Sequence, residues 1–253
     1  MFYHNHEHLK VFTYNIHKGF SVANIRFVLH EIRDEIIKIL PDVVLLQEIQ
    51  GEHITRSETI DNWPNQSQFE FLAQEAWPHH TYGKNAIYRE GHHGNAILSK
   101  HPILSFENID VSENKRTSRS VLHITIAHPR YKKPIHIICI HFSLFKSGRL
   151  RQLQKLVDRI ESHVPHNEPI IVGGDFNDWR KDAEDFLETH LELKEVFKHL
   201  HGHHAKTFPS WQPTLEVDRI YYRGVEAEVC RRYAQQPWQQ LSDHLPLYAV
   251  FKL

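Results

Sequence analysis

The stretch Ile170–Trp179, IIVGGDFNDW, joins an apolar strand to a cluster of polar residues. Its first residues, Ile170–Val172, are β-branched and apolar, which is typical of a buried strand. Two glycines follow and favour a tight turn, because glycine adopts positive φ at little steric cost. Asp175 and Asn177 come directly afterwards. An Asp or Asn after a strand is usually a turn former, so this stretch alone indicates a strand and a turn.

Other apolar segments of strand length recur on both sides of this stretch. They are short and rich in Val and Ile, as buried strands are, and they lie at Leu9–Tyr14, Val43–Leu46, Ala96–Leu98, Val121–Ile126, Ile135–Ile140, Ile220–Tyr222 and Leu247–Phe251. Helix-period segments separate some of them, at Ile25–Leu40, Arg149–Val164 and Ala183–His190. This mixed pattern predicts an α/β fold in which two β-sheets pack face to face with helices outside.

The chain shows no internal boundary. It has no Gly/Ser/Pro-rich linker and no internal repeat, so we expect residues 1–253 to form a single domain. The polar segments Glu52–Gln68 and His199–Pro213 are predicted to be long surface loops.

The composition is that of an ordinary globular protein, with 40% hydrophobic and 24% charged residues. The formal net charge is −1, so the chain lacks the overall excess of basic residues that is typical of a general nucleic-acid binder. This total is still compatible with a local basic cleft. No apolar run reaches the roughly 18 to 20 residues of a membrane span, and the start MFYHNHEHLK lacks the apolar core of a signal peptide. We therefore expect a cytoplasmic monomer in which Cys139 and Cys230 are buried thiols.

Histidine is unusually frequent, with 23 residues. The clusters His4–His8 and His199–His204 are interpreted as solvated loops that bind metal only adventitiously. The pair His92–His93 precedes the strand Ala96–Leu98, which is expected to end at a cleft. For this pair, contact with a substrate and exposure to solvent are both open.

Polar residues follow or open several predicted strands, and the edge of a sheet would gather them into one cleft. They are Asn15, Gln47, Glu48, His141, Asp175, Asn177, Asp218, Asp243 and His244. Hydrolysis of a phosphate ester needs this inventory. A hard cation such as Mg²⁺ binds carboxylate and amide oxygens, a base orients a water, and donors stabilise charge on the phosphoryl oxygens.

A set of motifs in fixed order gives this inventory a family context. They are YNIHKG, DVVLLQEI, HHGNAILS, CIHFSL, IIVGGDFNDW, VDRIYY and LSDHLPL. In this combination the chain resembles the endonuclease/exonuclease/phosphatase superfamily, from about residue 9 to the C-terminus. Within it, the HKG, EGHHGNA and GDFNDW runs are similar to those of a bacterial subgroup. The resemblance implies a DNase I-like four-layer α/β sandwich with two mixed sheets, and hydrolysis of phosphate esters with Mg²⁺ or Mn²⁺.

The resemblance also implies roles for individual residues. Glu48 matches the principal metal ligand, and Asn15 and Asp243 help to form the shell around the ion. Asp175 matches the residue that orients or deprotonates the attacking water, and Asn177 the donor that steadies the pentacovalent phosphate.

Three further residues complete this implied catalytic set. His244 matches a histidine that binds the phosphoryl oxygens, and Asp218 its carboxylate partner, which fixes the orientation of the ring. His141 would stabilise the phosphate or protonate the leaving oxygen.

One position departs from the family pattern. Certain nucleases carry an acidic second metal ligand where this chain has His17, which favours a one-metal site or a contact between His17 and phosphate. Further substrate-binding candidates are His92, His93, Asn95 and Arg119.

The sequence leaves the substrate open. Nucleic acid is one possibility, because Trp179, Lys206, Phe208 and Trp211 lie in loops that could flank the cleft and offer stacking surfaces. These aromatic residues could equally pin the loops to the core. The near-neutral charge balance mildly favours the alternative, a phospholipid or sugar-phosphate phosphodiesterase. A catalytically inactive binding module is a third alternative, which the presence of Glu48, Asp175 and His244 argues against.

Overall fold

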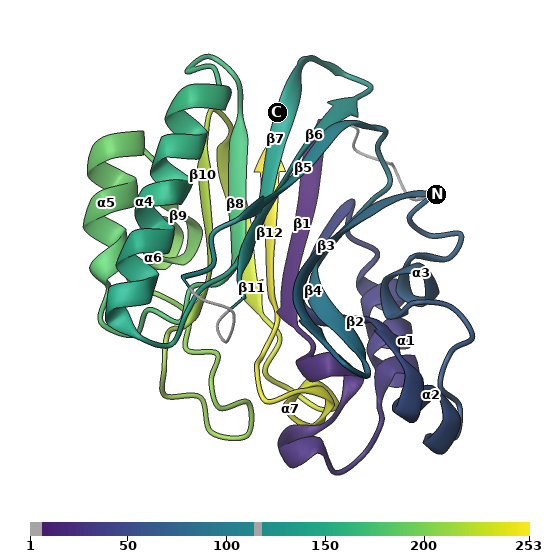
Figure 1. Cartoon of the computed structure of the whole chain (residues 1–253). Helices are drawn as coiled ribbons and strands as arrows, with labels where there is room; N and C mark the ends of the chain where they lie inside the picture. Colours follow the sequence, from purple (N-terminus) through teal and green to yellow (C-terminus); the bar gives the residue numbers. More distant parts are fainter. Residues whose placement is uncertain (1–6, 114–117) are drawn as a thin grey trace.

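The computed structural model describes residues 7–113 and 118–253 and contains two six-stranded mixed sheets packed face to face (Figure 1). In the first sheet the strand order is β11-β12-β1-β2-β4-β3, with β1 His8–Asn15, β2 Val43–His53, β3 His79–Tyr88, β4 Gly91–Ser99, β11 Glu226–Arg232 and β12 Leu247–Lys252. In the second it is β5-β6-β7-β8-β10-β9, with β5 Ile103–Asp110, β6 Ser120–His128, β7 Tyr131–His141, β8 Ile170–Asp175, β9 Lys194–Glu195 and β10 Asp218–Arg223.

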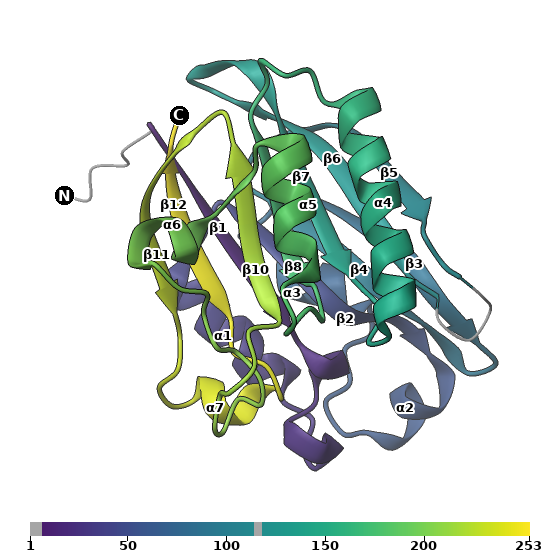
Figure 2. The ribbon, with the colours of Figure 1, turned by 90° about the vertical axis from the view of Figure 1, so that its left-hand side faces the viewer.

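Helices cover the outer faces of the two sheets, so the molecule has four layers (Figures 1 and 2). On the first sheet lie α1 Leu29–Ile39, α3 Gln68–Ala73 and α7 Trp238–Leu241, and on the second α4 Lys146–His163 and α5 Asp182–Leu191. The short helices α2 Ile54–Thr59 and α6 Val196–His201 complete the chain, with the 3₁₀ turns η1 His17–Gly19 and η2 Val22–Asn24. This architecture confirms the predicted two-sheet sandwich.

Three apolar layers hold the sandwich together. Strand β2 shows why its run is wholly apolar: Val43 and Leu45 face the second sheet, while Val44 and Leu46 face the helices. Alternate residues of a strand point to opposite faces, and both faces of this strand are buried. Fully burying one such side chain stabilises the fold by about 1.5–3 kcal/mol.

The parallel strand pairs bring the predicted polar residues to one edge. Strand β1 runs parallel to β2 with Asn15 opposite Gln47, and β7 runs parallel to β8 with His141 opposite Asp175. Strand β10 is antiparallel to β8 and starts with Asp218 opposite Asp175. Asp243 and His244 directly precede β12, whose start lies at the same end as that of β10. Both sheets therefore contribute side chains to a common edge.

The structure corrects several boundaries. The predicted loop Glu52–Gln68 contains the end of β2 and helix α2, and the predicted loop His199–Pro213 begins inside α6. Helix α1 starts at Leu29 and not at Ile25, because Phe20 and Phe27 pair as an isolated β-bridge and Ser21 accepts the backbone N–H of Arg26. These bonds hold the preceding residues out of a helix.

The histidine clusters are less uniform than predicted. His4 and His6 lie outside the described residues, whereas His8 belongs to β1 and pairs with Glu228. In the later cluster, His204 is buried between Glu184 and Glu195, so the prediction of a solvated loop is wrong for this residue. A buried polar ring needs hydrogen-bond partners, and the two carboxylates supply them.

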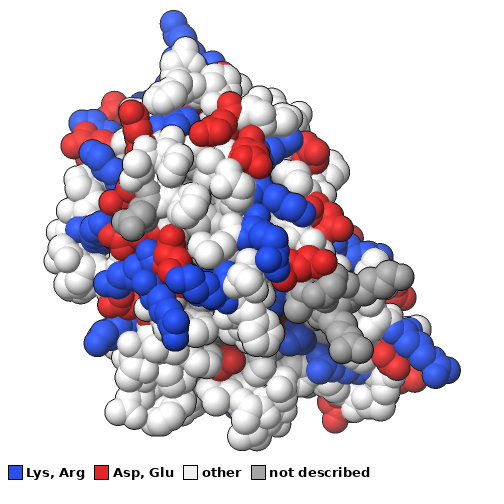
Figure 3. Space-filling model, turned by 60° about the vertical axis from the view of Figure 1, so that its left-hand side comes forward, with Lys and Arg blue, Asp and Glu red and all other residues white. Residues whose placement is uncertain are grey.

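Three expectations about surface and thiols can be compared with the structure. Cys139 and Cys230 are free and buried, as expected. Within residues 7–113 and 118–253, no helix has the length and apolar character needed to cross a bilayer. On the face shown in Figure 3, Lys and Arg side chains are interspersed with Asp and Glu, in keeping with the formal net charge of −1.

Candidate active site

A cavity of about 240 Å³ lies at the edge to which both sheets contribute. Part of its lining is apolar. The rest consists of residues that the sequence predicted for the site, namely Glu48, Arg119, His141, Asp175, Asn177, Asp243 and His244. The strand register explains why residues almost 200 positions apart in the chain meet here.

Asp175 lies at the centre of this group. Its Oδ2 accepts hydrogen bonds from Nδ2 of Asn15 at 3.1 Å and Nδ2 of Asn177 at 3.3 Å. The same oxygen lies 3.5 Å from Nε2 of His141 and 3.8 Å from Nε2 of His244. Burial raises the pKa of Asp175 above its ordinary range, although the charge of His244 opposes the shift. A carboxylate with a raised pKa is a better proton acceptor near neutral pH.

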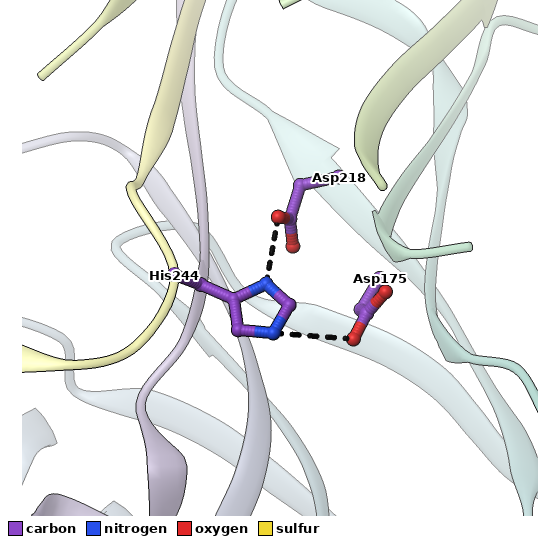
Figure 4. Close-up of side chains that lie close together, drawn as sticks. All are labelled: Asp175, Asp218 and His244. Carbon is purple, nitrogen blue, oxygen red and sulfur yellow. Dashed lines mark hydrogen bonds and ion pairs between the residues drawn. The ribbon is translucent and has the colours of Figure 1, made fainter. Parts of the chain in front are cut away.

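His244 lies between two buried carboxylates (Figure 4). Its Nδ1 is 2.8 Å from Oδ2 of Asp218, and its Nε2 faces Asp175. Burial alone would lower the pKa of His244, but the carboxylates of Asp218 and Asp175 outweigh it and raise the pKa to about 10. His244 is therefore an imidazolium at neutral pH, oriented by Asp218 and placed beside the cavity.

Two neighbours of Asp175 have distinct electrostatic character. The backbone N–H of Asn177 donates to Oδ1 of Asp175 at 2.9 Å, and its side-chain Nδ2 also donates to the carbonyl of Phe142. Asn177 therefore orients the Asp175 carboxylate in this structure. Burial, together with the charge of Arg119, holds the pKa of His141 well below its ordinary value. His141 is thus a neutral ring that can donate one hydrogen bond.

Glu48 supplies a further carboxylate to the lining of the cavity. It lies in a bulge of β2 against β4 and has a φ of 54°, a conformation that is uncommon for a residue with a side chain. Its Oε2 accepts a hydrogen bond from Nζ of Lys18 at 2.7 Å. Burial would raise the pKa of Glu48, but the neighbouring His141 and the ammonium of Lys18, which also donates a hydrogen bond, hold it well below its usual range.

The donor atoms around Glu48 fit a hard divalent cation. Glu48 and Asp243 line the same cavity, and Asn15 lies at the adjoining end of β1. Among the residues that the structure describes, the side-chain oxygen of Asn15 accepts a hydrogen bond from the backbone N–H of His17, at 3.2 Å, and from no other group, so one of its lone pairs stays available. Carboxylate and amide oxygens are the ligands that Mg²⁺ and Mn²⁺ prefer.

A second group of potential ligands has a different character. Among the residues that the structure describes, Asp175, Asp218 and His244 bring ligand atoms within 4.8 Å of one another. However, His244 carries a proton on each ring nitrogen when it is an imidazolium, and a protonated ring cannot bind a metal. In this protonation state the group holds protons, and the oxygen atoms of Glu48, Asp243 and Asn15 offer a separate position for a cation.

The remaining predicted residues divide into those near the cavity and those away from it. Arg119 lines it, with Nε donating to the carbonyl of Phe142. His17 Nδ1 lies 3.8 Å from Oδ1 of Asp243. Burial lowers the pKa of His93 to about 4, and the charge of Lys18 adds to this shift whereas that of Glu48 opposes it, which places His93 beside the same charges.

Two predicted residues lie elsewhere. His92 Nδ1 is 2.9 Å from the hydroxyl of Tyr82, and His92 does not line the cavity. Asn95 is fully buried on β4 and donates to the carbonyl of Ser120, thereby joining the two sheets.

Two polar atoms near the site lack a partner. Nδ1 of His17 and Nδ1 of His93 are buried and have no hydrogen-bond partner among the described residues. Unpaired buried polar atoms are costly and are uncommon in folded proteins. In addition, His17, Lys18, Glu48 and Asn177 all have positive φ. Such strained conformations cluster at functional sites, where the surrounding structure maintains them.

The structure adds residues that the sequence interpretation missed. Lys18, from the HKG run, pairs with Glu48. Asp178, the last acidic residue of GDFNDW, is fully buried and pairs with Arg149 and Arg219, which fixes the loop after β8. The position of Lys18 directly after His17, in what the structure shows to be a 3₁₀ turn, was the sequence signal for this residue. The role of Asp178 depends on tertiary contacts that a sequence pattern does not reveal.

Comparisons with known proteins agree with this geometry. The chain is 43% identical over 244 residues to the Escherichia coli K12 protein YbhP, described as uncharacterized, with 96% of each chain covered. An endonuclease/exonuclease/phosphatase structure from Beutenbergia cavernae matches with a TM-score of 0.77 and 18% identity, over 98% of this chain and 72% of that one. Zebrafish (D. rerio) TDP2 in complex with a single-strand DNA product matches with a TM-score of 0.71 and 18% identity, over 97% and 99%.

The profile of the Endonuclease/Exonuclease/phosphatase family matches residues 12–244. This range includes every predicted site residue and all strands except β12 and the first residues of β1. Together with the four-layer fold and the array at its edge, this match shows that the chain belongs to the endonuclease/exonuclease/phosphatase family.

Proposed function

We propose that this protein is a divalent-metal-dependent phosphodiesterase of the nuclease type, with residues 1–253 forming one catalytic domain. The observation that supports this most directly is the buried array of Asp175, His244 and Asp218 facing a cavity that also holds the Glu48 carboxylate. A proton acceptor, a fixed positive charge and oxygen ligands for a cation thus meet in one place.

In the proposed reaction, the Asp175 carboxylate orients a water and takes its proton as the oxygen attacks phosphorus, while the phosphorus–oxygen bond to the leaving group breaks in line with the attack and the leaving oxygen takes its proton from solvent. The raised pKa of Asp175 suits it to this role near neutral pH. The His244 imidazolium, held by Asp218, stabilises negative charge that develops on the phosphoryl oxygens. Asn177 keeps the carboxylate in position through its backbone N–H.

The low pKa of His141 selects between its two predicted roles. A neutral imidazole is too weak an acid to protonate a leaving oxygen, so we assign His141 to hydrogen bonding with the phosphoryl group. Mg²⁺ or Mn²⁺, held by Glu48 and Asp243 with the Asn15 oxygen, would supply Lewis-acid stabilisation of the same charge.

Bis(p-nitrophenyl) phosphate provides the direct test, because it reports hydrolysis of a diester without requiring a particular natural substrate. We expect turnover with Mg²⁺ or Mn²⁺, none in excess EDTA, and loss of turnover in Asp175→Asn. Asp34→Asn is the matched control, since Asp34 is an exposed carboxylate on α1. Turnover by Asp175→Asn equal to that of the control would remove Asp175 from the mechanism. A wild-type protein inactive with both metals would overturn the proposed function, in favour of a binding module.

A further inference from the structure

The cavity has an apolar wall in addition to its charged residues. The wall comes from three loops near the ends of β7, β8 and β10, and consists of Leu144, Trp179, Phe208, Leu215 and Val217. Trp179 belongs to the same GDFNDW run as Asp175 and Asn177 and is 39% exposed. A large aromatic side chain is therefore open to solvent within the same cavity as the proposed reacting groups.

A buried cation, Arg149, packs against the ring of Trp179. The guanidinium carbon of Arg149 lies 5.4 Å from the centre of the Trp179 ring. Arg149 is almost fully buried and forms ion pairs with Asp178 at 3.3 Å and Asp182 at 3.4 Å, so it is fixed in place. A cation at this distance from an indole ring is attractive and holds the ring in one orientation. One side of the ring is covered by protein, and its remaining surface borders the cavity.

A purely structural role does not account for the exposure of this ring. The loop is already fixed by Asp178, which accepts the backbone N–H groups of Asp182 and Ala183 and pairs with Arg219. A tryptophan that served only to pin the loop would gain more by being buried. Close by, Leu144 and Phe145, from the loop between β7 and α4, are 58% and 71% exposed. Exposed apolar side chains gathered beside a cavity are typical of a ligand-binding surface.

The shape of the wall favours a flat group over a long chain. The cavity volume of about 240 Å³ lies below the roughly 300–1,000 Å³ of pockets that enclose drug-sized ligands. It can hold the phosphate and one adjoining ring, whereas an acyl chain would extend beyond it. A rigid indole offers a flat face, and stacking on aromatic side chains is how proteins bind bases without reading their sequence.

We propose that Trp179 is a stacking surface for a nucleobase whose sugar carries the scissile phosphate. This inference rests on the proposed function, because it names the substrate class of the same cavity. Trp179 would then determine which esters are used efficiently, while Asp175 and His244 act on the phosphate of any ester that enters. The effect of removing the ring should therefore depend on the organic group of the substrate.

The test compares three p-nitrophenyl diesters that differ only in the second group, which is methyl, octyl or the 5′-carbon of thymidine. In Trp179→Ala, we expect kcat/KM for the thymidine ester to fall about 5- to 150-fold relative to the methyl ester. Trp179→Phe should retain most of the preference, and Trp179→Leu should lose it. Phe106→Ala is the matched control, because Phe106 is 63% exposed on the edge strand β5 and does not line the cavity.

Two results would overturn the stacking role. The first is an unchanged ratio of thymidine to methyl ester in Trp179→Ala. The second is an equal loss for the octyl ester together with full retention in Trp179→Leu, which would indicate a general apolar wall for lipids.

A binding measurement separates this inference from the proposed function. Calorimetric titration with thymidine 5′-monophosphate should show weaker binding to Trp179→Ala, while binding of inorganic phosphate stays unchanged. This measurement decides the stacking role even in a protein that hydrolyses none of the esters, a result that would count only against the proposed function. Equal affinity of wild type and Trp179→Ala for the nucleotide refutes the stacking role.

Discussion

Replacing Asp218 by Asn tests the assignment of His244 as a fixed positive charge. Asp218 is buried, and its carboxylate lies 2.8 Å from Nδ1 of His244. An amide oxygen of the same shape can still accept the ring N–H, so the change removes the negative charge and leaves the local geometry. Any effect can then be ascribed to electrostatics.

The expected size follows from the contact. A hydrogen bond to a charged group contributes about 1.5–3 kcal/mol, against about 0.5–1.5 kcal/mol for a neutral one. The difference of roughly 1–2 kcal/mol corresponds to about one pKa unit, by which the pKa of His244 should fall from its value of about 10. The same loss in the transition state would reduce kcat/KM about tenfold or more.

NMR titration of metal-free protein labelled at histidine measures the pKa of His244 directly. His244→Gln identifies the resonance among the 23 histidines by its disappearance. Asp34→Asn serves again as the surface control. An unchanged titration of His244 in Asp218→Asn would refute the reasoning, whatever happens to turnover.

Stability provides a second readout of the same variant. The folded-state pKa of His244 lies above its ordinary value, so its contribution to stability is fully present below about pH 6.5 and is lost as the pH rises through about 10. Because the pKa of His244 in Asp218→Asn should be about one unit lower, both proteins lose this contribution in parallel up to about pH 9, and the thermal stability of the wild type relative to Asp218→Asn should decrease between about pH 9 and pH 10.

Other variants test the remaining assignments. Glu48→Gln should raise the Mg²⁺ concentration required for half-maximal activity about tenfold or more, since it deletes a charged ligand, and an identical metal titration would show that the ligand lies elsewhere. Burial raises the pKa of Asp175, so its contribution to stability is present at acid pH and lost as the pH rises through the folded-state pKa. Asp175→Asn should consequently gain in Tm relative to the wild type between pH 4 and pH 8, and a constant difference would contradict the raised pKa. Replacing both His92 and His93 by Ala should weaken use of a large substrate more than of a small ester, with His93 accounting for most of the loss because His92 is held by Tyr82. Comparing kcat/KM for the two single variants checks this, and equal losses from both would mean that the strand orientation is misjudged.

The predicted strands were those in the interior of the sheets. Strand β2 is buried on both faces and β8 along its length, and such strands leave continuous apolar runs. Strands β3, β5 and β11 were not predicted, and all three lie at sheet edges. Strand β5 is exposed at most of its residues, so its sequence carries no apolar period to detect.

The site residues that could be predicted from the sequence are those placed at the end or the start of a strand. Asp175 and Asp218 meet because β8 and β10 pair in that register, and the packing of one sheet on the other brings His244 to them. His92 and His93 could not be distinguished, because adjacent residues of a strand point to opposite faces. Which one faces the cavity depends on bulges in the pairing of β4 with β2 and β3, and these are set by tertiary packing.

The division of the site between two sheets has a consequence for how the protein loses activity. The bond from Asn15 to Asp175 and the bond from Asp218 to His244 each connect one sheet to the other. A relative displacement of about 1 Å can reduce turnover on the order of a hundredfold, long before either sheet melts. Heat inactivation should thus precede the loss of far-ultraviolet circular dichroism. Substitutions in the layer between the sheets, such as at Leu45 or Ile124, should reduce activity more than equally destabilising substitutions beneath the helices.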